Sequence, residues 1–594
     1  MKELLTGNEA LARGAWEAGV RFASAYPGTP STEILENFTT YPEITAEWAT
    51  NEKTALEAVI GASFAGARAI ASMKHVGVNV AADPLFTVAY TGVNGGLVIV
   101  SADEPGQHSS QNEQDNRHFA VAAKIPMLEP ADSQECRDMT IAAFELSEQF
   151  DTPFMIRITT RVCHSKSIAE FGDRLEREPK PYVKNPPKYM MVPALAKVRR
   201  AIMEERLQKL KDASEASPFN RIVPGGKTGV VCSGMCYNFA REVFGDTATY
   251  LKLGFTNPLP DNLLKKFCAQ VDEIYVIEEN DPYLENWIKQ NGFACKGKDV
   301  FPAFGEMLPD VLRAAVFGGK LPQLEYDRGL VVPRPPTLCA GCPHRGLFYE
   351  LGKKKNVVVS GDIGCYTLAF ADPYNAMDST ICMGSAFSIG HGMQTMFDKT
   401  GRRGTRVVAV MGDSTFFHTG LNSLCEVMYN GSRTICVILD NRITGMTGHQ
   451  ENPGSGKLAG GQPAPVMDIA AIVKAMGVKN VAEVNPNDLK AVRAALNDAL
   501  GNDDEPSVII TKWPCVLKRM DKSEREQYGN PFTEKFCVDA EKCIACKLCI
   551  RSGCPAISID TAVNKSVIDQ SQCVGCGVCA QICPKQAIGV KGGN

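Results

Sequence analysis

The sequence predicts an α/β protein with three doubly wound parallel sheets and a small α+β module at the C-terminus. Length is the first observation, because 594 residues at roughly 150 residues per domain suggest about four domains. Second, apolar strand-like runs alternate with helical stretches over most of the chain, which is the pattern of parallel sheets. Third, residues 535–594 differ in kind, being rich in cysteine and internally repeated.

Composition excludes several classes of protein. The chain carries 63 Lys and Arg against 67 Asp and Glu, a net charge of −4, so no basic surplus indicates binding to nucleic acid or to an anionic membrane. The longest apolar runs, such as Val407–Met411 and Ile435–Leu439, are far shorter than the ~18 residues of a membrane helix. The N-terminal sequence lacks the apolar core of a signal peptide, so we expect a cytoplasmic protein.

The expected domains follow one another along the chain. Residues 1–165 form a first α/β domain, whose expected elements are the strands Phe22–Tyr26, Ala69–Met73, Leu97–Ser101 and Phe154–Ile158 and a helix over Glu52–Ala67. A charged, proline-containing connecting segment, 166–225, contains an expected helix over Val198–Ala213. The remaining expected parts are an α/β domain at 226–320, a linker at 321–336, an α/β domain at 337–530 and the cysteine-rich module at 535–594.

Two cysteine motifs in the last module have the spacing of iron–sulfur ligands. The first is Cys543-x2-Cys546-x2-Cys549-x4-Cys554-Pro555 and the second is Cys573-x2-Cys576-x2-Cys579-x3-Cys583-Pro584. In two-cluster ferredoxins the fourth cysteine of each motif ligates the other cluster. One [4Fe-4S] cluster therefore takes Cys543, Cys546, Cys549 and Cys583, and the other takes Cys573, Cys576, Cys579 and Cys554.

The alternatives for these thiols are zinc ligation or a set of buried free thiols. The first motif departs from the usual run, because four residues rather than three precede Cys554. Cys537 is an extra thiol that we interpret as structural.

The strand Val407–Met411 ends in Gly412-Asp413-Ser414, and the strand Ile435–Leu439 ends in Asp440-Asn441. This resembles the G-D-G…N motif of thiamine-diphosphate enzymes. Mg²⁺ takes about six oxygen ligands and is commonly held by one or two side chains plus substrate phosphates, which suits Asp413 and Asn441. The resemblance implies that the Ile443 carbonyl is a third ligand, that Gly412 admits the phosphates, and that Thr444–Gly448 closes over them. Ser414 departs from the pattern, where glycine is common.

Thiamine enzymes divide cofactor binding between two α/β domains, and the domain for the pyrimidine supplies a carboxylate. Glu52, at the start of the helix in the first domain, is the candidate. The alternative is a solvated glutamate stabilised at the helix N-terminus by the helix dipole.

Together, four separated motifs resemble the 2-oxoacid:ferredoxin oxidoreductases. These are Tyr26–Thr32, the Glu52 helix, the Gly412-Asp413 turn and the double cysteine motif. Within that family, the run Cys339–Arg345 and the domain order resemble indolepyruvate ferredoxin oxidoreductase alpha subunits. The resemblance implies oxidative decarboxylation of an aryl pyruvate (indolepyruvate or phenylpyruvate) on thiamine diphosphate with Mg²⁺. Electrons then pass singly to iron–sulfur clusters and to external ferredoxin, and the acyl group passes to coenzyme A.

Further roles follow from the same resemblance. Thr29 and an arginine, for which Arg117 is the nearest match, would contact the substrate carboxylate; a surface salt bridge is the alternative for Arg117. Glu278 and Glu279 match a pattern that we interpret as structural. A third cluster would use Cys339, Cys342, Cys365 and Cys515, and four reduced, partly buried thiols are the alternative.

Relatives also carry a gamma-type domain that we do not find in this sequence. We therefore expect a separate beta subunit, in an αβ or α2β2 complex. Three other functions stay open: the same chemistry on another 2-oxoacid such as pyruvate, a non-redox thiamine decarboxylase or carboligase, and an electron-transfer subunit with a degenerate thiamine fold.

Overall fold

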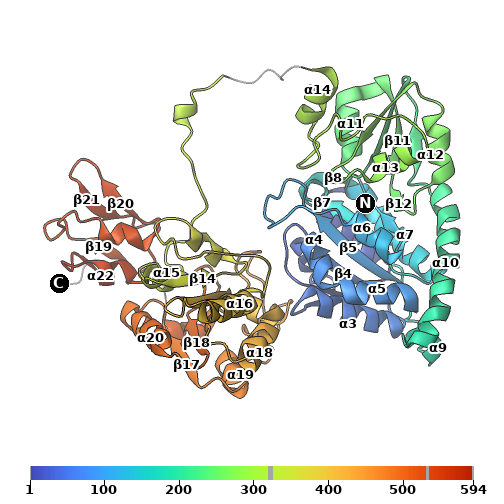
Figure 1. The fold of residues 1–594 in the computed structure, drawn as a ribbon. Coiled ribbons are helices and arrows are strands. Elements are labelled where there is room, and N and C mark those ends of the chain that lie inside the picture. Colours follow the sequence, from blue (N-terminus) through green and yellow to red (C-terminus); the bar gives the residue numbers. More distant parts are fainter. Residues whose placement is uncertain (1, 319–324, 530–533, 591–594) are drawn as a thin grey trace. The chain divides into compact units, whose positions relative to one another are not determined.

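The computed structural model describes residues 2–318, 325–529 and 534–590 (Figure 1). The expected boundaries at residues 320 and 530 and the two chain ends lie outside the described residues. The chain divides into two compact units, Met1–Tyr326 and Asp327–Asn594, which are described separately. Among the described residues, no helix is both long and apolar enough to cross a membrane.

Unit 1, residues 1–326, contains a seven-stranded sheet. Its strand order is β12 (Phe255–Asn257), β6 (Met127–Leu128), β7 (Phe154–Thr159), β5 (Leu97–Asp103), β4 (Ala69–Lys74), β2 (Phe22–Ala25) and β3 (Thr45–Trp48). All neighbouring strands are parallel except β12, which pairs antiparallel with β6. Strands β4, β5 and β7 are buried along their whole length, as expected for a sheet that is covered on both faces.

Helices cover both faces of this sheet. They are α1 (Gly7–Glu17), α2 (Thr32–Phe38), α3 (Glu52–Phe64), α4 (His75–Val80), α5 (Ala82–Thr91), α6 (Arg117–Ala123), α7 (Ser133–Phe150) and α8 (Thr160–His164). Two separate apolar clusters result, one including Leu11 and Phe144 and the other including Leu56 and Leu85. A two-stranded ribbon of β1 (Lys2–Thr6) and β8 (Lys166–Glu170) adjoins this core.

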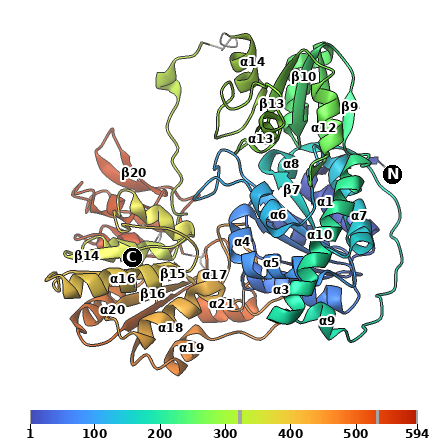
Figure 2. The ribbon, with the colours of Figure 1, turned by 45° about the vertical axis from the view of Figure 1, so that its right-hand side comes forward.

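A second sheet in unit 1 has the order β13 (Glu273–Ile277), β10 (Thr228–Ser233), β11 (Ala248–Leu253) and β9 (Arg221–Val223). Strand β9 is antiparallel to β11, and the other pairs are parallel. The elements around it are α9 (Pro186–Tyr189), α10 (Pro193–Glu215), α11 (Cys236–Phe244), η1 (Gly245–Thr247), α12 (Asp261–Cys268), α13 (Tyr283–Gln290) and α14 (Pro309–Phe317). The long helix α10 contacts both α5 and α12 and so joins the two sheets (Figures 1 and 2).

The pairing in unit 1 differs from the division expected from the sequence. Strand β12 lies within the segment expected as the second domain, yet it completes the first sheet through β6. Strand β9 lies within the expected connecting segment, yet it pairs with β11. Both are three-residue edge strands, too short to carry a periodic signal that could assign them to a sheet.

Unit 2, residues 327–594, contains a five-stranded sheet in which every pair is parallel. Its order is β14 (Val357–Ser360), β15 (Arg406–Gly412), β16 (Ile435–Asp440), β18 (Ser507–Lys512) and β17 (Asn480–Val484). The surrounding elements are η2 (Arg328–Leu330), α15 (His344–Leu351), η3 (Cys365–Phe370), α16 (Ala386–Lys399), α17 (Asp413–Thr415), η4 (Phe416–Gly420), α18 (Leu421–Tyr429), α19 (Ile469–Ala475), α20 (Leu489–Gly501) and α21 (Lys522–Tyr528). Apolar clusters lie on both faces of this sheet as well.

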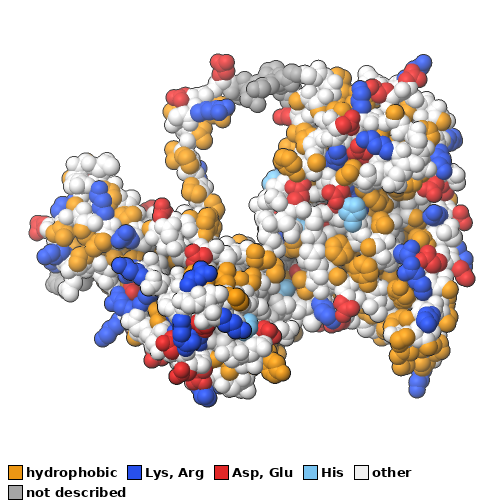
Figure 3. All heavy atoms as spheres, in the orientation of Figure 1, with side chains coloured by type: hydrophobic (Ala, Val, Ile, Leu, Met, Phe, Trp, Pro, Cys, Tyr) orange, Lys and Arg blue, Asp and Glu red, His pale blue; other side chains and the backbone are white. Residues whose placement is uncertain are grey.

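The cysteine-rich module consists of two short antiparallel pairs, β19 (Phe536–Val538) with β22 (Ile588–Val590) and β20 (Ile557–Asp560) with β21 (Lys565–Ile568). Two short helical turns, η5 (Leu548–Ser552) and α22 (Val578–Ile582), lie within the two cysteine motifs, each just before the last cysteine. The expectation of several parallel sheets followed by a different, smaller C-terminal module is confirmed. On the face shown in Figure 3, basic and acidic side chains are intermixed within each unit.

Gly66 provides a test of how the connecting segment is held in unit 1. Gly66 has φ +97°, and a Cβ there would overlap the carbonyl oxygen of Lys180, whose amide donates to the Gly66 carbonyl at 3.0 Å. We expect Gly66→Ala to lower the unfolding free energy by at least about 1–2 kcal/mol, because a positive φ disfavours a side chain. Gly61→Ala, in α3 with no atom within 4 Å of the new Cβ, should stabilise by about 0.5–1 kcal/mol. Thermal unfolding midpoints check the pair, and an equal effect of both substitutions would contradict the assignment.

Candidate functional site

Asp413 lies directly after strand β15 and is 2% exposed. Its Oδ1 accepts a hydrogen bond from the Ser414 amide at 2.8 Å, and its Oδ2 accepts one from the Asn452 side chain at 3.3 Å. Burial and the neighbouring Asp440 carboxylate raise the pKa of Asp413 to about 8. A buried carboxylate beside a second one is stabilised by a cation, so this turn fits a metal-bound diphosphate.

The segment after strand β16 turns back onto the Asp413 turn. The Asn441 Oδ1 accepts from the Ile443 amide at 3.3 Å, and the Thr444 hydroxyl donates to the Ser414 hydroxyl oxygen at 2.9 Å. The structure thus brings together the predicted cofactor residues at the carboxyl ends of two adjacent strands. These are Gly412, Asp413, Ser414, Asn441, Ile443 and Thr444.

The small size of Gly412 is explained by the packing of Tyr366 as well as by the expected approach of the phosphates. Its φ is −79°, so no left-handed conformation requires glycine. A Cβ at this position would lie 3.0 Å from the Cε1 atom of Tyr366. Space for the Tyr366 ring therefore accounts for the small residue in this structure.

Two further residues of this edge were not found from the sequence. Asp362, fully buried after strand β14, accepts hydrogen bonds from the amides of Gly384 and Ala386, each at 2.9 Å, and burial raises its pKa to about 6. Its context, Gly361-Asp362, repeats the pattern of Gly412-Asp413 and could have indicated it. Asn452 lies in an irregular loop and carries no local signal.

The thiols Cys339, Cys342, Cys365 and Cys515 share one neighbourhood in unit 2. Burial raises the pKa of Cys342 to about 12 and that of Cys365 to about 11, and the charges of Cys515 and Cys339 add to both shifts. The Cys342 amide donates to the Cys339 carbonyl at 3.0 Å, which closes the C-x2-C turn. Four thiols from three separate segments therefore lie near one another, and a [4Fe-4S] cluster takes the same number of sulfur donors.

This thiol group is joined directly to the edge of the sheet where Asp413 and Asn441 lie, called the diphosphate edge below. The Cys515 amide donates to the Asn441 carbonyl at 2.9 Å, and the Trp513 amide donates to the Asp440 carbonyl at 3.0 Å. The charge of Asp413 also contributes to the raised pKa of Cys515, after the larger effect of burial.

In the cysteine-rich module, Cys543, Cys546, Cys549 and Cys583 line one hollow together with Ser566. The Cys549 thiol donates to the Ser566 hydroxyl oxygen at 3.2 Å, and the Ala587 amide donates to the Cys583 sulfur at 3.2 Å. Hydrogen bonds from the backbone at Ser566 and Ala545 lower the pKa of Cys543. Amide donors to sulfur are a common feature of iron–sulfur sites.

The thiols of the second set also lie near one another; they are Cys554, Cys573, Cys576 and Cys579. Burial raises the pKa of Cys579, and the charges of Cys576, Cys554 and Cys573 raise it further. Cys549 and Cys583 of the first set pack in one cluster with Cys554 and Cys579 of the second, so the two sets are neighbours.

The extra residue before Cys554 lies where the module packs against the α/β part of unit 2. Gly553 has φ +65°, and a Cβ there would lie 2.7 Å from the Tyr374 hydroxyl oxygen. The Tyr374 hydroxyl donates to the Ser552 carbonyl at 2.6 Å. The longer spacing therefore forms a docking turn.

In unit 1, Glu52 begins helix α3 and is 6% exposed, not solvated as the alternative interpretation supposed. A Cβ at Gly77 in helix α4 would lie 2.7 Å from the Glu52 Oε1 atom. Thr29 is half-buried in the turn after strand β2.

Lys74, the last residue of strand β4, and His75, which follows it, were missed although they occupy the same kind of strand end. The Lys74 ammonium lies 3.2 Å from a Glu104 carboxylate oxygen, and burial lowers the pKa of Lys74 while Glu104 opposes that shift. The His75 ring is fully buried, with Nε2 3.2 Å from the Asn112 carbonyl oxygen.

Arg117 does not fit the expected contact with a substrate carboxylate, nor is it a surface residue. It is 1% exposed, and its guanidinium donates to Asp115, to the Glu278 carboxylate at 2.7 Å and to the Glu279 carbonyl at 2.9 Å. These partners occupy the guanidinium, so we interpret Arg117 as a buried structural ion pair between the two sheets of unit 1.

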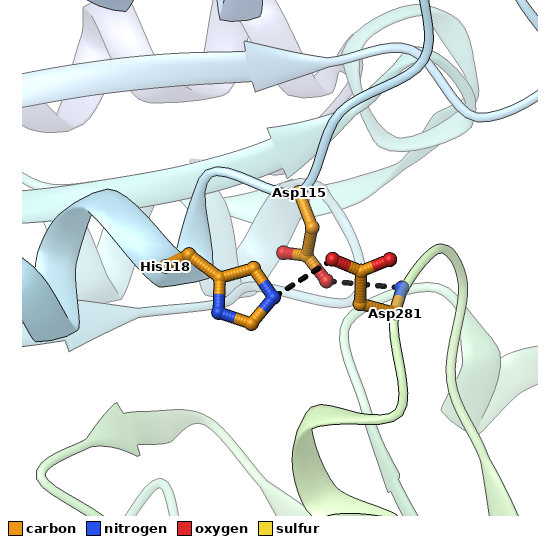
Figure 4. A group of neighbouring side chains, drawn as sticks. All are labelled: Asp115, His118 and Asp281. Carbon is orange, nitrogen blue, oxygen red and sulfur yellow. Dashed lines mark hydrogen bonds and ion pairs between the residues drawn. The ribbon is translucent and has the colours of Figure 1, made fainter.

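Asp115 also belongs to a group with His118 and Asp281 (Figure 4). The His118 Nε2 lies 2.8 Å from the exposed Asp281 carboxylate, and the Asp281 amide donates to Asp115 at 3.3 Å. Because Arg117 already neutralises Asp115, this group is accounted for by ion pairing and does not need a metal.

Three parts of the chain match models of known protein families. Residues 13–211 match a family described as pyruvate flavodoxin/ferredoxin oxidoreductase, thiamine diP-bdg. Residues 362–511 match the thiamine pyrophosphate enzyme C-terminal TPP binding domain, and residues 566–589 match the 4Fe-4S binding domain. The chain therefore contains a thiamine diphosphate binding domain and a 4Fe-4S binding domain.

The chain is similar over nearly its whole length to curated relatives. The indolepyruvate oxidoreductase subunit IorA of Pyrococcus horikoshii is 38% identical over 98% of this chain and 96% of the relative. The subunit of the same name from Methanothermobacter thermautotrophicus is 39% identical over 100% of this chain and 98% of the relative.

Among solved structures, a 2-oxoglutarate:ferredoxin oxidoreductase from Magnetococcus marinus matches with a TM-score of 0.42 and 16% identity, covering 52% of this chain and 63% of the other. The family resemblance stated from the sequence is confirmed by the full-length relatives. The chain is an oxidoreductase subunit and belongs to the family of indolepyruvate oxidoreductase IorA subunits.

Proposed function

We propose that this chain, with a partner subunit, oxidatively decarboxylates aryl pyruvates such as indolepyruvate and phenylpyruvate. Coenzyme A accepts the acyl group as aryl-acetyl-CoA, CO2 is released, and electrons pass through [4Fe-4S] clusters to ferredoxin. The observation that supports this proposal most directly is the hydrogen bond from the Cys515 amide to the Asn441 carbonyl, because it joins one of the four cysteines to the segment that we propose as part of the metal site. The names of the full-length relatives support indolepyruvate as the substrate.

Asp413 and the Asn441 side chain would hold Mg²⁺, with the Ile443 carbonyl as a third ligand. When bound, thiamine diphosphate supplies the electron sink that decarboxylation of a 2-oxoacid requires. The protein binds and orients the cofactor through the turns at Gly412–Ser414 and 441–444. We propose Glu52 as the carboxylate partner of the aminopyrimidine, which its burial supports, and Thr29 as a contact for the substrate carboxylate.

The thiols define the electron path that we propose. Cys339, Cys342, Cys365 and Cys515 would hold a third [4Fe-4S] cluster, and the two sets of the cysteine-rich module would hold the other two. Such clusters would supply one-electron carriers between the diphosphate edge and external ferredoxin. A decarboxylase without redox chemistry needs no such carriers, so these thiol groups favour the oxidoreductase.

Asp413→Asn tests the metal site. We expect the variant to lose thiamine diphosphate on gel filtration and to lose nearly all 2-oxoacid-dependent dye reduction, because the amide cannot supply an anionic ligand to Mg²⁺. Asp468→Asn, an exposed N-cap where both residues serve equally well, is the matched control and should keep both properties. Retention of the cofactor by Asp413→Asn at the wild-type level would remove Asp413 from the site.

Iron content tests the third cluster. Anaerobically purified protein should contain about twelve iron atoms per chain, three cubanes of four. Cys515→Ser should lower the count to about eight, whereas Cys425→Ser, at an exposed thiol of helix α18, should leave it unchanged. A wild-type count near eight would reject the third cluster and leave the two-cluster module intact.

The partner and the substrate are tested in one assay. The isolated chain should bind thiamine diphosphate but reduce dye poorly, and anaerobic co-expression with the partner subunit should restore rapid reduction with indolepyruvate or phenylpyruvate and coenzyme A. Full activity of the single chain would contradict the partner requirement. Faster turnover with pyruvate than with aryl pyruvates would reassign the substrate.

A further inference from the structure

Arg345 is a buried cation whose partners are all neutral oxygens. It lies near the start of helix α15, three residues after Cys342, and is 1% exposed. Its guanidinium donates to the Cys339 carbonyl at 2.9 Å, to the Tyr374 hydroxyl oxygen at 2.7 Å and to the Ser552 carbonyl at 3.1 Å. A further hydrogen bond goes to the Leu338 carbonyl.

Other buried arginines of the chain have carboxylate partners. Arg117 pairs with Glu278 at 2.7 Å, and Arg157 pairs with Asp103 at 2.7 Å. Within residues 2–318, 325–529 and 534–590, no carboxylate forms an ion pair with Arg345. Burying a charge without an opposite charge costs several kcal/mol, so the position of Arg345 points to an anion that the side chains do not supply.

The surroundings of Arg345 identify that anion. The Cys339 carbonyl belongs to the C-x2-C turn of the third thiol group, and the Ser552 carbonyl belongs to the turn that ends in Cys554 of the cysteine-rich module. Arg345 therefore lies between two groups of thiols.

At the same junction, the C-x2-C turn and the second cysteine motif approach each other closely. Gly341, in the C-x2-C turn, has φ +70°, and a Cβ there would overlap Cγ2 of Val574 in the second cysteine motif. The two thiol groups are thus held against each other from both sides, by Gly341 and by the docking turn at Ser552 and Gly553.

We propose that Arg345 is a positioning residue that acts as a shared counter-ion for two iron–sulfur clusters, the one held by Cys339, Cys342, Cys365 and Cys515 and the one held by Cys554, Cys573, Cys576 and Cys579. This inference rests on the proposed function, because it assumes that both thiol groups carry clusters.

The physical effect of Arg345 is on the reduction potentials. Each electron that enters a cluster adds one negative charge, and a nearby cation in a site of low dielectric stabilises that charge. Arg345 therefore raises the potential of both clusters relative to a neutral side chain. This favours electron transfer from the cofactor side into the cysteine-rich module.

The alternative role is a purely mechanical link between the two turns. Tyr374 makes such a link without a charge, since its hydroxyl donates to the same Ser552 carbonyl. Tyr374→Phe removes a hydrogen bond at the junction and keeps the cation, and Arg345→Gln removes the cation. Arg345→Lys keeps the charge but loses the planar, forked arrangement of the guanidinium N–H donors. Arg493→Gln, at a half-exposed arginine of helix α20 paired with Glu350, controls for the loss of any positive charge.

The test is a potentiometric titration, followed by electron paramagnetic resonance, of the anaerobic complex with its partner subunit, together with iron content. For Arg345→Gln we expect full iron and a reduction equilibrium of at least one cluster that is tenfold or more less favourable, about 59 mV to the negative side. Arg345→Lys, Tyr374→Phe and Arg493→Gln should stay within a factor of three of the wild type.

Unchanged potentials in an iron-loaded Arg345→Gln, or an equal shift in Tyr374→Phe or Arg345→Lys, would overturn the proposal. If Arg345→Gln does not load iron, Arg345→Lys decides between the two roles. Iron loading of Arg345→Lys with wild-type potentials supports the counter-ion role. A failure of Arg345→Lys to load iron shows that Arg345 is only a mechanical link between the two turns. The wild-type iron count and thiamine diphosphate content, measured on the same preparations, test the proposed function separately.

Discussion

The hydrogen bond between the Cys515 amide and the Asn441 carbonyl is the constraint on which the interpretation of this protein depends. Asn441 follows strand β16 at the edge where Asp413 is buried, and Cys515 lies just beyond strand β18, the next strand of the sheet. Because parallel strands end at one edge, the two segments that follow β16 and β18 are brought side by side. The turn that we propose as the metal site and the thiol group are thereby joined through backbone hydrogen bonds. In the proposed function, these bonds couple the site where electrons are released to the groups that carry them away.

Buried ionisable side chains are a second feature of this structure, and they include both carboxylates and an arginine. Asp413 and Asp440 are two neighbouring carboxylates at the sheet edge, and burial together with their proximity raises the pKa of Asp413 to about 8. Arg345, at the junction with the cysteine-rich module, is a cation that the described carboxylates do not neutralise. Protein interiors rarely retain such charges without compensation. A metal cation beside Asp413 would compensate the carboxylates, and anionic clusters beside Arg345 would compensate the guanidinium. The two features therefore support the same set of cofactors.

Much of the fold was predictable because buried parallel strands leave a strong apolar signal. The strands Ala69–Met73, Phe154–Ile158 and Ile435–Leu439 were each predicted one residue short at the C-terminal end, and Val407–Met411 was one residue short at each end. The short edge strands β9 and β12 were not assigned to their sheets, since three residues carry no usable periodicity. Among site residues, Cys543, Cys546, Cys549 and Cys583, which the motif spacing groups, line one hollow in the structure. Arg117 was misjudged because its carboxylate partner Glu278 is 161 residues away in the sequence, and Asp362 was overlooked although it follows a strand in the same way as Asp413.

The order in which the iron–sulfur groups are reduced tests the central claim most directly. The anaerobic complex, with thiamine diphosphate and Mg²⁺ bound, would be mixed with indolepyruvate and coenzyme A, frozen at successive times, and examined by electron paramagnetic resonance. We predict that a signal lost in Cys515→Ser appears first, and that the signals of the cysteine-rich module follow it. Reduction of the module at the same rate in wild type and Cys515→Ser, or clusters that stay oxidised after the 2-oxoacid is added, would contradict the account.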